Sequence, residues 1–231
     1  MIGAMPEQLF LPGIDPPPRP LPRSRSKVLR KEPPPHTLFL ALVPHTPDAT
    51  AIAALGERMN SQHALKGTLV EAHRLHVTLF DLGGHAQVPA SLVAQASTAA
   101  ASVPVPAFDI VFEKAMSFAK GALVLCAEDE QNVSALRSFR QRLGEALADA
   151  GLKPPRSFTP HMTVAYARRK LEKHALEAPV RWTAGSLVLI DSHVGEGVHE
   201  VLGRWPDAPD APNLPPDLPD LSPERLGTTG A

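Results

Sequence analysis

Short apolar runs alternate along the middle of this chain with longer segments in which apolar residues recur every three or four positions. Runs such as TLFLALVP predict buried strands, because they are brief and are stopped by proline or glycine. The segment NVSALRSFRQRLGEALADAG predicts a helix, since Leu136, Leu143 and Leu147 share one helical face. Either Phe139 or Arg140 continues that face. The expected strands are 37–44, 74–82, 107–115, 121–128, 161–168, 181–191 and 199–205, and the expected helices are 47–60, about 89–102 and 132–151.

This order, β-α-β-α-β followed by β-α-β-β-β, predicts an α+β fold. Because the two halves resemble each other, we expect two similar lobes. Each lobe would hold an antiparallel or mixed sheet with its helices outside.

Proline separates both ends of the chain from this pattern. Of the 26 prolines, 17 lie in segments 1–35 and 206–231, where they disfavour regular elements. Six basic and three acidic residues give the first segment a charge of +3, and one basic and five acidic residues give the last a charge of −4. We expect both to be disordered extensions of a folded domain, 36–205. The basic arm could touch RNA phosphates, but a solvated leader is the favoured interpretation.

Composition limits the classes of partner. The net charge of −1 gives no overall reason to wrap nucleic acid, although a local patch is enough to bind an RNA end. The single cysteine, Cys126, cannot form an internal disulfide, which fits a reducing cytoplasm. No apolar run approaches the ~18 residues that span a bilayer, and the first residues lack a signal-peptide pattern. We expect a cytoplasmic monomer that does not bind membranes.

Two H-x-T motifs carry the candidate chemistry. His76 and Thr78 form the first, and His161 and Thr163 form the second, 85 residues later. A single strand histidine is more often a core or surface residue, and one such tripeptide is a weak signal. Two copies on two predicted strands are far less accidental. Residues i and i+2 of a strand share a face, so each motif presents an imidazole and a hydroxyl together.

Two such units that face each other suit the cleavage of a phosphodiester. One imidazole removes a proton from the attacking oxygen, and the other gives a proton to the leaving oxygen. Threonine hydroxyls donate hydrogen bonds to the non-bridging phosphate oxygens. No carboxylate-rich cluster that would hold a metal lies near either motif, so no cofactor is expected.

The chain resembles the 2H phosphoesterase superfamily, and within it the bacterial 2′-5′ RNA ligase-like RNA 2′,3′-cyclic phosphodiesterases. The resemblance runs over about residues 37–205 and rests on the motifs TLFLALVP, RLHVTLFDLG, FTPHMTVAYARR and GSLVLIDSHVGEGVHEVLGRWP. It implies a bilobal fold with a pseudo-twofold central cleft. It also implies metal-independent opening of an RNA 2′,3′-cyclic phosphate to the 2′-phosphate, with 2′-5′ ligation as the reverse reaction.

The resemblance makes His76 and His161 the acid–base pair and gives phosphate binding to Thr78 and Thr163. By analogy with the family, His76 would be the general acid on the leaving 3′-oxygen, and His161 the base that activates water. The sequence is equally compatible with the reverse assignment.

Other residues are candidate substrate contacts. Many family members carry arginine five residues after the second histidine, where this chain has Tyr166, and Arg168 or Arg169 could supply the charge instead. Phe80, at i+2 from the first threonine, would either stack on a base or pack beneath the motif. Arg156 is either a contact for a flanking phosphate or a surface arginine.

The remaining residues of note have simpler interpretations. Phe118 and Lys120 are expected in a hairpin loop rather than at the rim of a site. His174, His193 and His199 show no spacing typical of zinc ligands.

Three functions fit these observations. The leading one is hydrolysis of RNA 2′,3′-cyclic phosphate ends. A second keeps the mechanism but acts on a small cyclic nucleotide or an ADP-ribose cyclic phosphate. The third is a non-catalytic RNA- or nucleotide-binding module, which the intact pair of motifs disfavours because a binder needs no opposed titratable groups.

Overall fold

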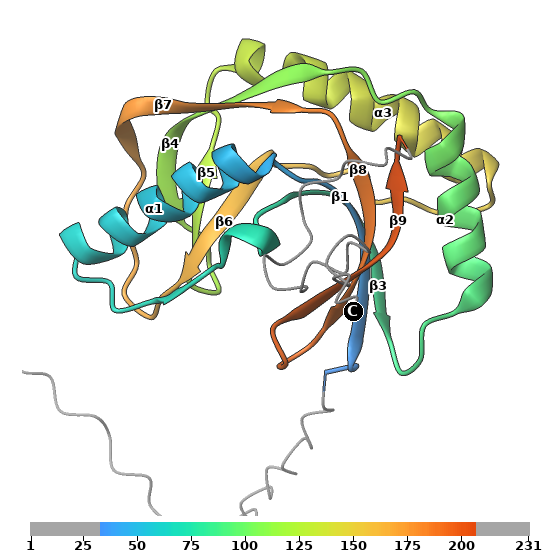
Figure 1. Cartoon of the computed structure of the whole chain (residues 1–231), viewed down its shortest axis with the longest axis horizontal. Helices are drawn as coiled ribbons and strands as arrows, with labels where there is room; N and C mark the ends of the chain where they lie inside the picture. The colour runs from blue at the N-terminus through green and yellow to red at the C-terminus, as the bar shows by residue number, and fades with distance from the viewer. Residues whose placement is uncertain (1–32, 207–231) are drawn as a thin grey trace, which may run out of the picture. The chain divides into compact units, whose positions relative to one another are not determined.

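The structure is a computed structural model that describes residues 33–206 (Figure 1). The predicted disorder of segments 1–35 and 206–231 stays a prediction, because residues 1–32 and 207–231 lie outside the described range. None of the helices within 33–206 is long and apolar enough to cross a membrane. The elements are β1 (His36–Leu42), α1 (Thr46–Gln62), β2 (Thr68–Leu69), η1 (Ala72–Arg74), β3 (Val77–His85), α2 (Ala90–Ser102), β4 (Phe108–Ser117), β5 (Ala122–Cys126), η2 (Glu130–Val133), α3 (Ser134–Asp149), β6 (His161–Tyr166), β7 (His174–Ala184), β8 (Leu187–His193) and β9 (Val198–Trp205).

The strands form two sheets, which confirms the predicted α+β fold. The first sheet has the order β3-β1-β8-β9 and the second the order β2-β6-β5-β4-β7. Each recorded strand pairing is antiparallel. The first H-x-T motif therefore lies in the first sheet and the second motif in the second sheet.

The sheets do not coincide with the two halves of the chain. The last two strands, β8 and β9, return to the first sheet, where β8 pairs with β1. The single strand predicted over 181–191 is wrong for this reason. Residues up to Ala184 pair with β4 of the second sheet, and residues from Leu187 onward pair with β1 of the first. A continuous apolar run gives no sign that a chain changes sheets.

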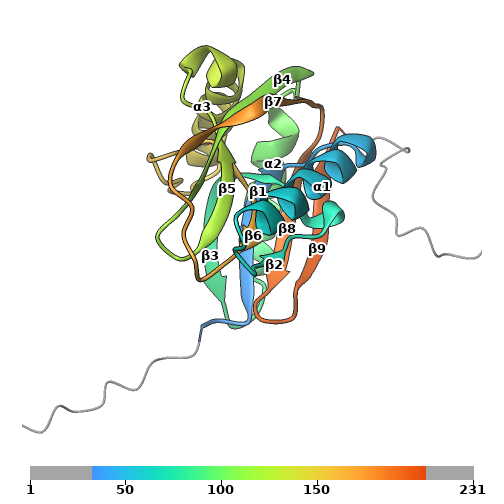
Figure 2. The ribbon, with the colours of Figure 1, turned by 90° about the vertical axis from the view of Figure 1, so that its left-hand side faces the viewer.

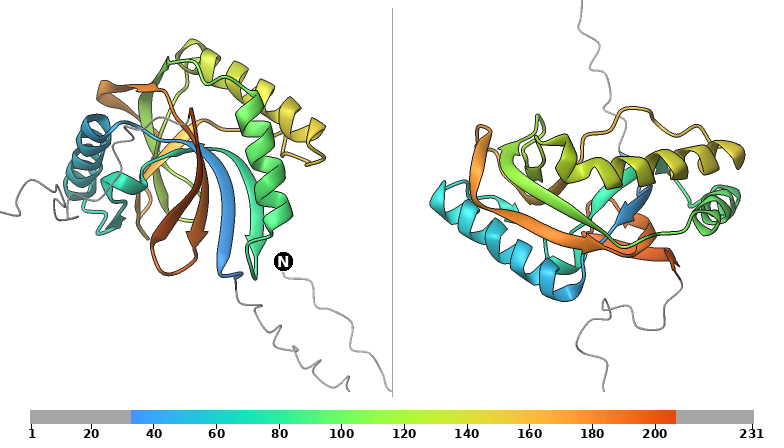
Figure 3. Two further views of the ribbon diagram at one scale, coloured as in Figure 1. Left: turned by 45° about the vertical axis from the view of Figure 1, so that its right-hand side comes forward. Right: turned by 90° about the horizontal axis from the view of Figure 1, so that it is seen from above.

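Helices cover one face of each sheet. The helix α1 contacts β6, α2 contacts β8 and β9, and α3 contacts β4 and α2 (Figures 2 and 3). Glycine permits a close approach at two of these contacts. A Cβ on Gly56 of α1 would lie 3.0 Å from Cβ of Val164, and one on Gly144 of α3 would lie 3.1 Å from Cζ of Phe80. Both partners lie on the H-x-T strands, so these helices back the two motifs directly.

The strand of the first motif differs from its predicted bounds. The strand begins at Val77 instead of residue 74, which ends a 3-10 turn over residues 72–74, and it continues through Gly83 and Gly84 to His85. Strand β2 was not expected at all, because its two residues are exposed and too few to make a pattern. The turn at 72–74 matters for the site, since it sets the direction in which His76 enters.

Candidate active site

His76 lies between the η1 turn and the first paired residue of β3. Its Nδ1–H donates a hydrogen bond to the carbonyl of Arg74, with an N···O distance of 2.7 Å. The ring stacks on Phe39 of β1, with a centroid distance of 4.9 Å and an interplanar angle of 24°. A carbonyl oxygen only accepts, so Nδ1 carries hydrogen and Nε2 is left for substrate.

His161, the first residue of β6, repeats this arrangement. Its Nδ1–H donates to the carbonyl of Thr159, also two residues earlier, over 2.7 Å. Its ring contacts Phe118, with a centroid distance of 4.9 Å and an angle of 52°. The hairpin loop expected at Phe118 therefore also supplies a neighbour to the second histidine. Both histidines are held in the same tautomer, with Nε2 free of partners within residues 33–206.

The two motifs come close to each other although they belong to different sheets. The Cα atoms of β3 and β6 approach within 8 Å. The pKa of His76 lies below its ordinary value, chiefly because the ring is buried and further because a protonated His161 repels its charge. The hydrogen bond to Arg74 opposes this shift. At neutral pH, His76 is therefore neutral in the free protein.

Both motif threonines are available to a ligand. Thr78 and Thr163 are partly buried on their strands. Neither hydroxyl has a hydrogen-bond partner among residues 33–206. Each can therefore donate to a phosphate oxygen placed between the motifs.

A β-bulge follows the threonine in each motif. In β3, Phe80 pairs with Leu40 and Thr78 with Ala41, so Leu79 is an extra residue. In β6, Ala165 pairs with Leu123 and Thr163 with Val124, so Val164 is extra. An extra residue reverses the alternation of faces beyond it. The fifth residue after each histidine, Asp81 or Tyr166, therefore returns to the face of the histidine.

The burial of Phe80 favours the second of its two interpretations, packing beneath the motif. Its side chain is 2% exposed and belongs to the core, on the opposite face from Thr78. It packs beneath the motif and is not a base-stacking residue, because the extra residue Leu79 shifts the alternation of faces by one position.

The bulge also places Tyr166 on the same face of β6 as His161. Tyr166 ends β6 with 55% of its surface exposed, beside Thr68 of β2. The hydroxyl and the ring are both accessible from solvent. The position where many relatives carry arginine is therefore occupied here by a side chain that can stack and can donate one hydrogen bond.

The two arginine candidates lie elsewhere. Arg168 is exposed beyond the end of β6 and makes no hydrogen bond or ion pair with residues 33–206. Arg156 lies in the wall of a cavity of about 830 Å³ between α3 and the loop at 152–158. No recorded contact within the described range joins Arg156 to either motif histidine. These two residues stay predicted contacts of a longer ligand rather than members of the two-histidine site.

A third histidine contacts the site and was not predicted. The ring of His199 on β9 lies 5.4 Å from that of His76 and 5.6 Å from that of Phe39, measured between centroids. Burial, followed by repulsion from the charge of His76, lowers the pKa of His199 to about 3. His199 therefore faces His76 as a neutral hydrogen-bonding group. Its position follows from the return of β9 to the first sheet, which the sequence did not reveal.

Arg140 of α3 links the two motifs from behind. Its Nε donates to the carbonyl of the bulge residue Leu79 over 3.1 Å, and its terminal nitrogens donate to the carbonyls of Pro155, Arg156 and Ser157 over 2.6, 3.4 and 3.3 Å. The guanidinium also lies over two aromatic rings, 4.4 Å from the centroid of Phe80 and 4.6 Å from that of Phe158. One side chain thus ties the first motif to the segment that enters the second.

Comparisons with known proteins show the family and the fold. A family model described as the 2′-5′ RNA ligase superfamily matches residues 44–196. Among solved structures, E. coli LigT with 3′-AMP is similar at a TM-score of 0.59 and 23% identity, covering 74% of this chain and 97% of that one. The protein TT0787 of Thermus thermophilus gives a TM-score of 0.51 at 20% identity, with 73% and 96% covered. A search of curated proteins finds no match.

Proposed function

This chain belongs to the 2′-5′ RNA ligase superfamily of two-histidine phosphoesterases, and from that premise we propose that it hydrolyses RNA 2′,3′-cyclic phosphate ends to 2′-phosphates. One observation carries the proposal. Two H-x-T motifs, on neighbouring strands of different sheets, each leave an imidazole Nε2 and a threonine hydroxyl without partners among residues 33–206. Such a pair can act on the two sides of one phosphorus atom, as in-line displacement demands.

We assign the base to His76 and the acid to His161. A neutral imidazole accepts a proton, and the lowered pKa keeps His76 neutral. His76 Nε2 takes a proton from water as the water oxygen bonds to phosphorus. The bond from phosphorus to O3′ breaks, and O3′ receives a proton from Nε2 of His161. The product is a 3′-hydroxyl and a 2′-phosphate. This assignment reverses the one drawn from the family analogy.

The threonines stabilise the charge that develops on phosphorus-bound oxygen. In the pentacoordinate state the non-bridging oxygens gain negative charge, and the hydroxyls of Thr78 and Thr163 donate to them. Tyr166 lies on the face of β6 that carries His161, and the ring of His199 lies beside that of His76. A nucleoside next to the phosphate would therefore meet an aromatic ring on the side of the second motif and a neutral imidazole on the side of the first. We infer that these two residues contact the terminal nucleoside rather than the phosphate.

The decisive experiment offers the full-length protein an oligoribonucleotide that ends in a 2′,3′-cyclic phosphate, in the presence of EDTA. We expect the mass of the oligonucleotide to rise by one water as the ring opens, and the new end to resist a phosphatase specific for 3′-phosphates. Cyclic mononucleotides and ADP-ribose cyclic phosphate form the comparison arm, since E. coli LigT is recorded with 3′-AMP and ATP. Faster turnover of the small substrates would indicate that the enzyme acts on small cyclic phosphates instead of RNA ends. If neither the oligoribonucleotide nor the small substrates were hydrolysed, the proposal would be refuted.

The pH dependence tests the assignment of the base. Because His76 must be neutral to accept a proton, kcat/KM is expected to fall as the pH drops through its pKa. Burial lowers that pKa, so the acid limb should have its midpoint below about 6.5. Phe39→Ala exposes the ring to water and should move the midpoint upward, toward the ordinary value. Initial rates between about pH 4.5 and 8 at low substrate measure both limbs, and a wild-type midpoint above about 6.5 would contradict the assignment.

A further inference from the structure

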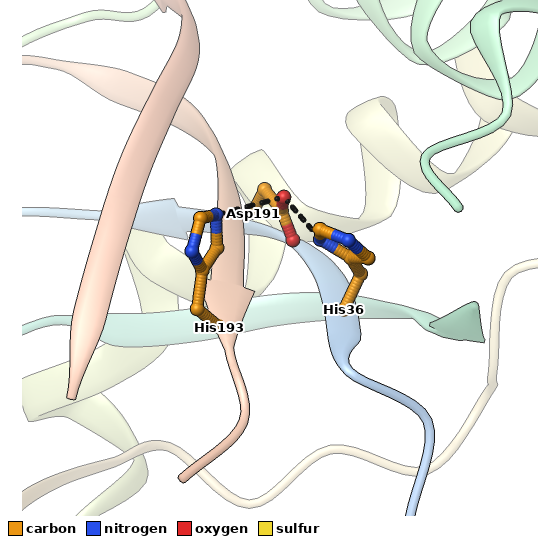
Figure 4. A group of neighbouring side chains, drawn as sticks. All are labelled: His36, Asp191 and His193. Atoms are coloured by element: carbon orange, nitrogen blue, oxygen red, sulfur yellow. Dashed lines mark hydrogen bonds and ion pairs between the residues drawn. The ribbon is translucent and has the colours of Figure 1, made fainter. Parts of the chain in front are cut away.

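A cluster of polar side chains lies at the far end of the first sheet. His36 of β1 pairs across the strands with His193 of β8, and Asp191 lies between them (Figure 4). Nδ1 of His36 is 2.8 Å from Oδ2 of Asp191, and Nε2 of His193 is 3.3 Å from the same oxygen. Glu200 of β9 pairs with Asp191, and its Oε2 is 3.6 Å from Nε2 of His193.

The cluster lies on the other face of the sheet from His76. Along β8, Leu187 and Leu189 point into the main core, and Asp191 continues their face because it follows Leu189 by two residues. Ile190 belongs to the opposite face, together with Phe39, which contacts His76. The cluster therefore has no part in the proposed phosphodiester chemistry.

Two atoms of the cluster are buried without a hydrogen-bond partner. Asp191 is 1% exposed. Among residues 33–206 it is the one charged residue that is buried. Its Oδ1 has no partner, and neither has Nε2 of His193, which is close to two carboxylates but not aligned for a hydrogen bond with either. A buried carboxylate oxygen without a protein partner is unfavourable unless an ordered water or a cation compensates it.

We propose that His36, Asp191 and His193 bind a divalent first-row transition-metal ion, with Glu200 or water as the fourth ligand. Imidazole and carboxylate ligands are typical of zinc sites. Around a tetrahedral Zn²⁺ with bonds of roughly 2.0–2.1 Å, ligand atoms lie about 3.3–3.4 Å apart. The separations of 2.8, 3.3 and 3.6 Å bracket that value, and one ligand atom from each of the three residues lies within 4.8 Å of the other two. Metal binding would displace the proton shared by Nδ1 of His36 and Oδ2 of Asp191, and Oδ1 of Asp191, which has no partner within the described range, is available as a further ligand atom.

The bound ion would join three strands. His36 comes from β1, Asp191 and His193 from β8, and Glu200 from β9. No spacing in the sequence indicates this site, because His36 and Asp191 are 155 positions apart and zinc ligands are usually found from short spacings. We expect the ion to stabilise the fold and to leave the hydrolysis of cyclic phosphates unchanged.

Zinc titration tests this site without any activity measurement. The full-length protein is treated with EDTA, the EDTA is removed by buffer exchange, and Zn²⁺ is then added. We expect one equivalent of Zn²⁺ to bind by calorimetry. At a free Zn²⁺ concentration about 100-fold above Kd, Tm should rise by roughly 5–10 °C. His36→Gln and His193→Gln should each weaken binding by at least about 100-fold, since even residues that only support a ligand change affinity 10–100-fold.

His85→Gln is the matched control. His85 pairs with His36 on the neighbouring strand β3, but its Nε2 lies 3.1 Å from the carbonyl of Leu82 and it is not in the cluster. The His85→Gln variant should bind Zn²⁺ with the same affinity as the unaltered protein. The proposal would be overturned if the unaltered protein bound Zn²⁺ no more tightly than His36→Gln does. It would also be overturned if His85→Gln lost as much Zn²⁺ affinity as His36→Gln. Circular dichroism without metal shows whether each variant is folded.

Discussion

Alanine at either motif histidine should lower kcat/KM for an RNA 2′,3′-cyclic phosphate at least about 100-fold, because general acid–base catalysis contributes 10²–10⁴. His76 and His161 have the same geometry, with Nδ1 bonded to a carbonyl and Nε2 free, so neither side chain can take over the task of the other. His73→Ala is the matched control. It removes an exposed imidazole three residues before His76, which forms an ion pair with the exposed Glu71, and should change the rate less than about threefold.

A substrate with a better leaving group separates the two roles. The leaving oxygen of a p-nitrophenyl phosphodiester departs without a proton, so loss of the general acid matters little. We expect His161→Ala to retain most of its activity on that substrate and His76→Ala to lose it. The opposite pattern would restore the assignment taken from the family analogy, and wild-type activity of both variants on the RNA substrate would exclude the two-histidine mechanism.

Methionine in place of Arg140 should lower the free energy of unfolding by about 2 kcal/mol, because the hydrogen bond to the partly buried carbonyl of Leu79 is lost. Methionine keeps much of the apolar contact with Phe80 and Phe158 but donates no hydrogen bonds. Hydrogen bonds from a charged donor contribute about 1.5–3 kcal/mol each, whereas the exposed loop carbonyls regain water. Urea unfolding measures the change.

The same substitution should reduce kcat/KM about tenfold or more, because small misplacements of catalytic groups have large effects on rate. Arg142→Met is the control. Arg142 lies on the same helix, is exposed and makes no hydrogen bond or ion pair with residues 33–206, so its loss should change the free energy of unfolding by less than about 1 kcal/mol. Equal stability of the two variants would show that Arg140 does not hold the motifs together.

Local spacing predicted the elements and the paired motifs well, because both depend on neighbours along the chain. The helical periodicity left open whether Phe139 or Arg140 faces inward, and the structure uses both: Phe139 is fully buried, and Arg140 covers Phe80. His199 contacts His76 only because β9 returns to the first sheet. That return depends on pairing between distant strands, which no local pattern encodes.

The two bulges also depend on strand pairing that the local sequence pattern does not encode, and each concerns a single extra residue. Strict alternation puts Phe80 beside Thr78 and would put Tyr166 on the face opposite His161. Both placements fail because an extra residue in one strand is defined by its partner strand. Once the bulges are known, the positions of both side chains follow. Local pattern therefore identified the proposed acid–base residues, and tertiary pairing determined the residues around them.

The bulge in β6 has a consequence for how this scaffold can diversify. Tyr166 is on the face of the histidine but outside the core, while its neighbours Val164 and Ala165 are buried. A substitution at 166 should therefore leave the packed interior unchanged. If the proposed function holds, this one exposed position can tune ligand preference independently of the stability of the domain.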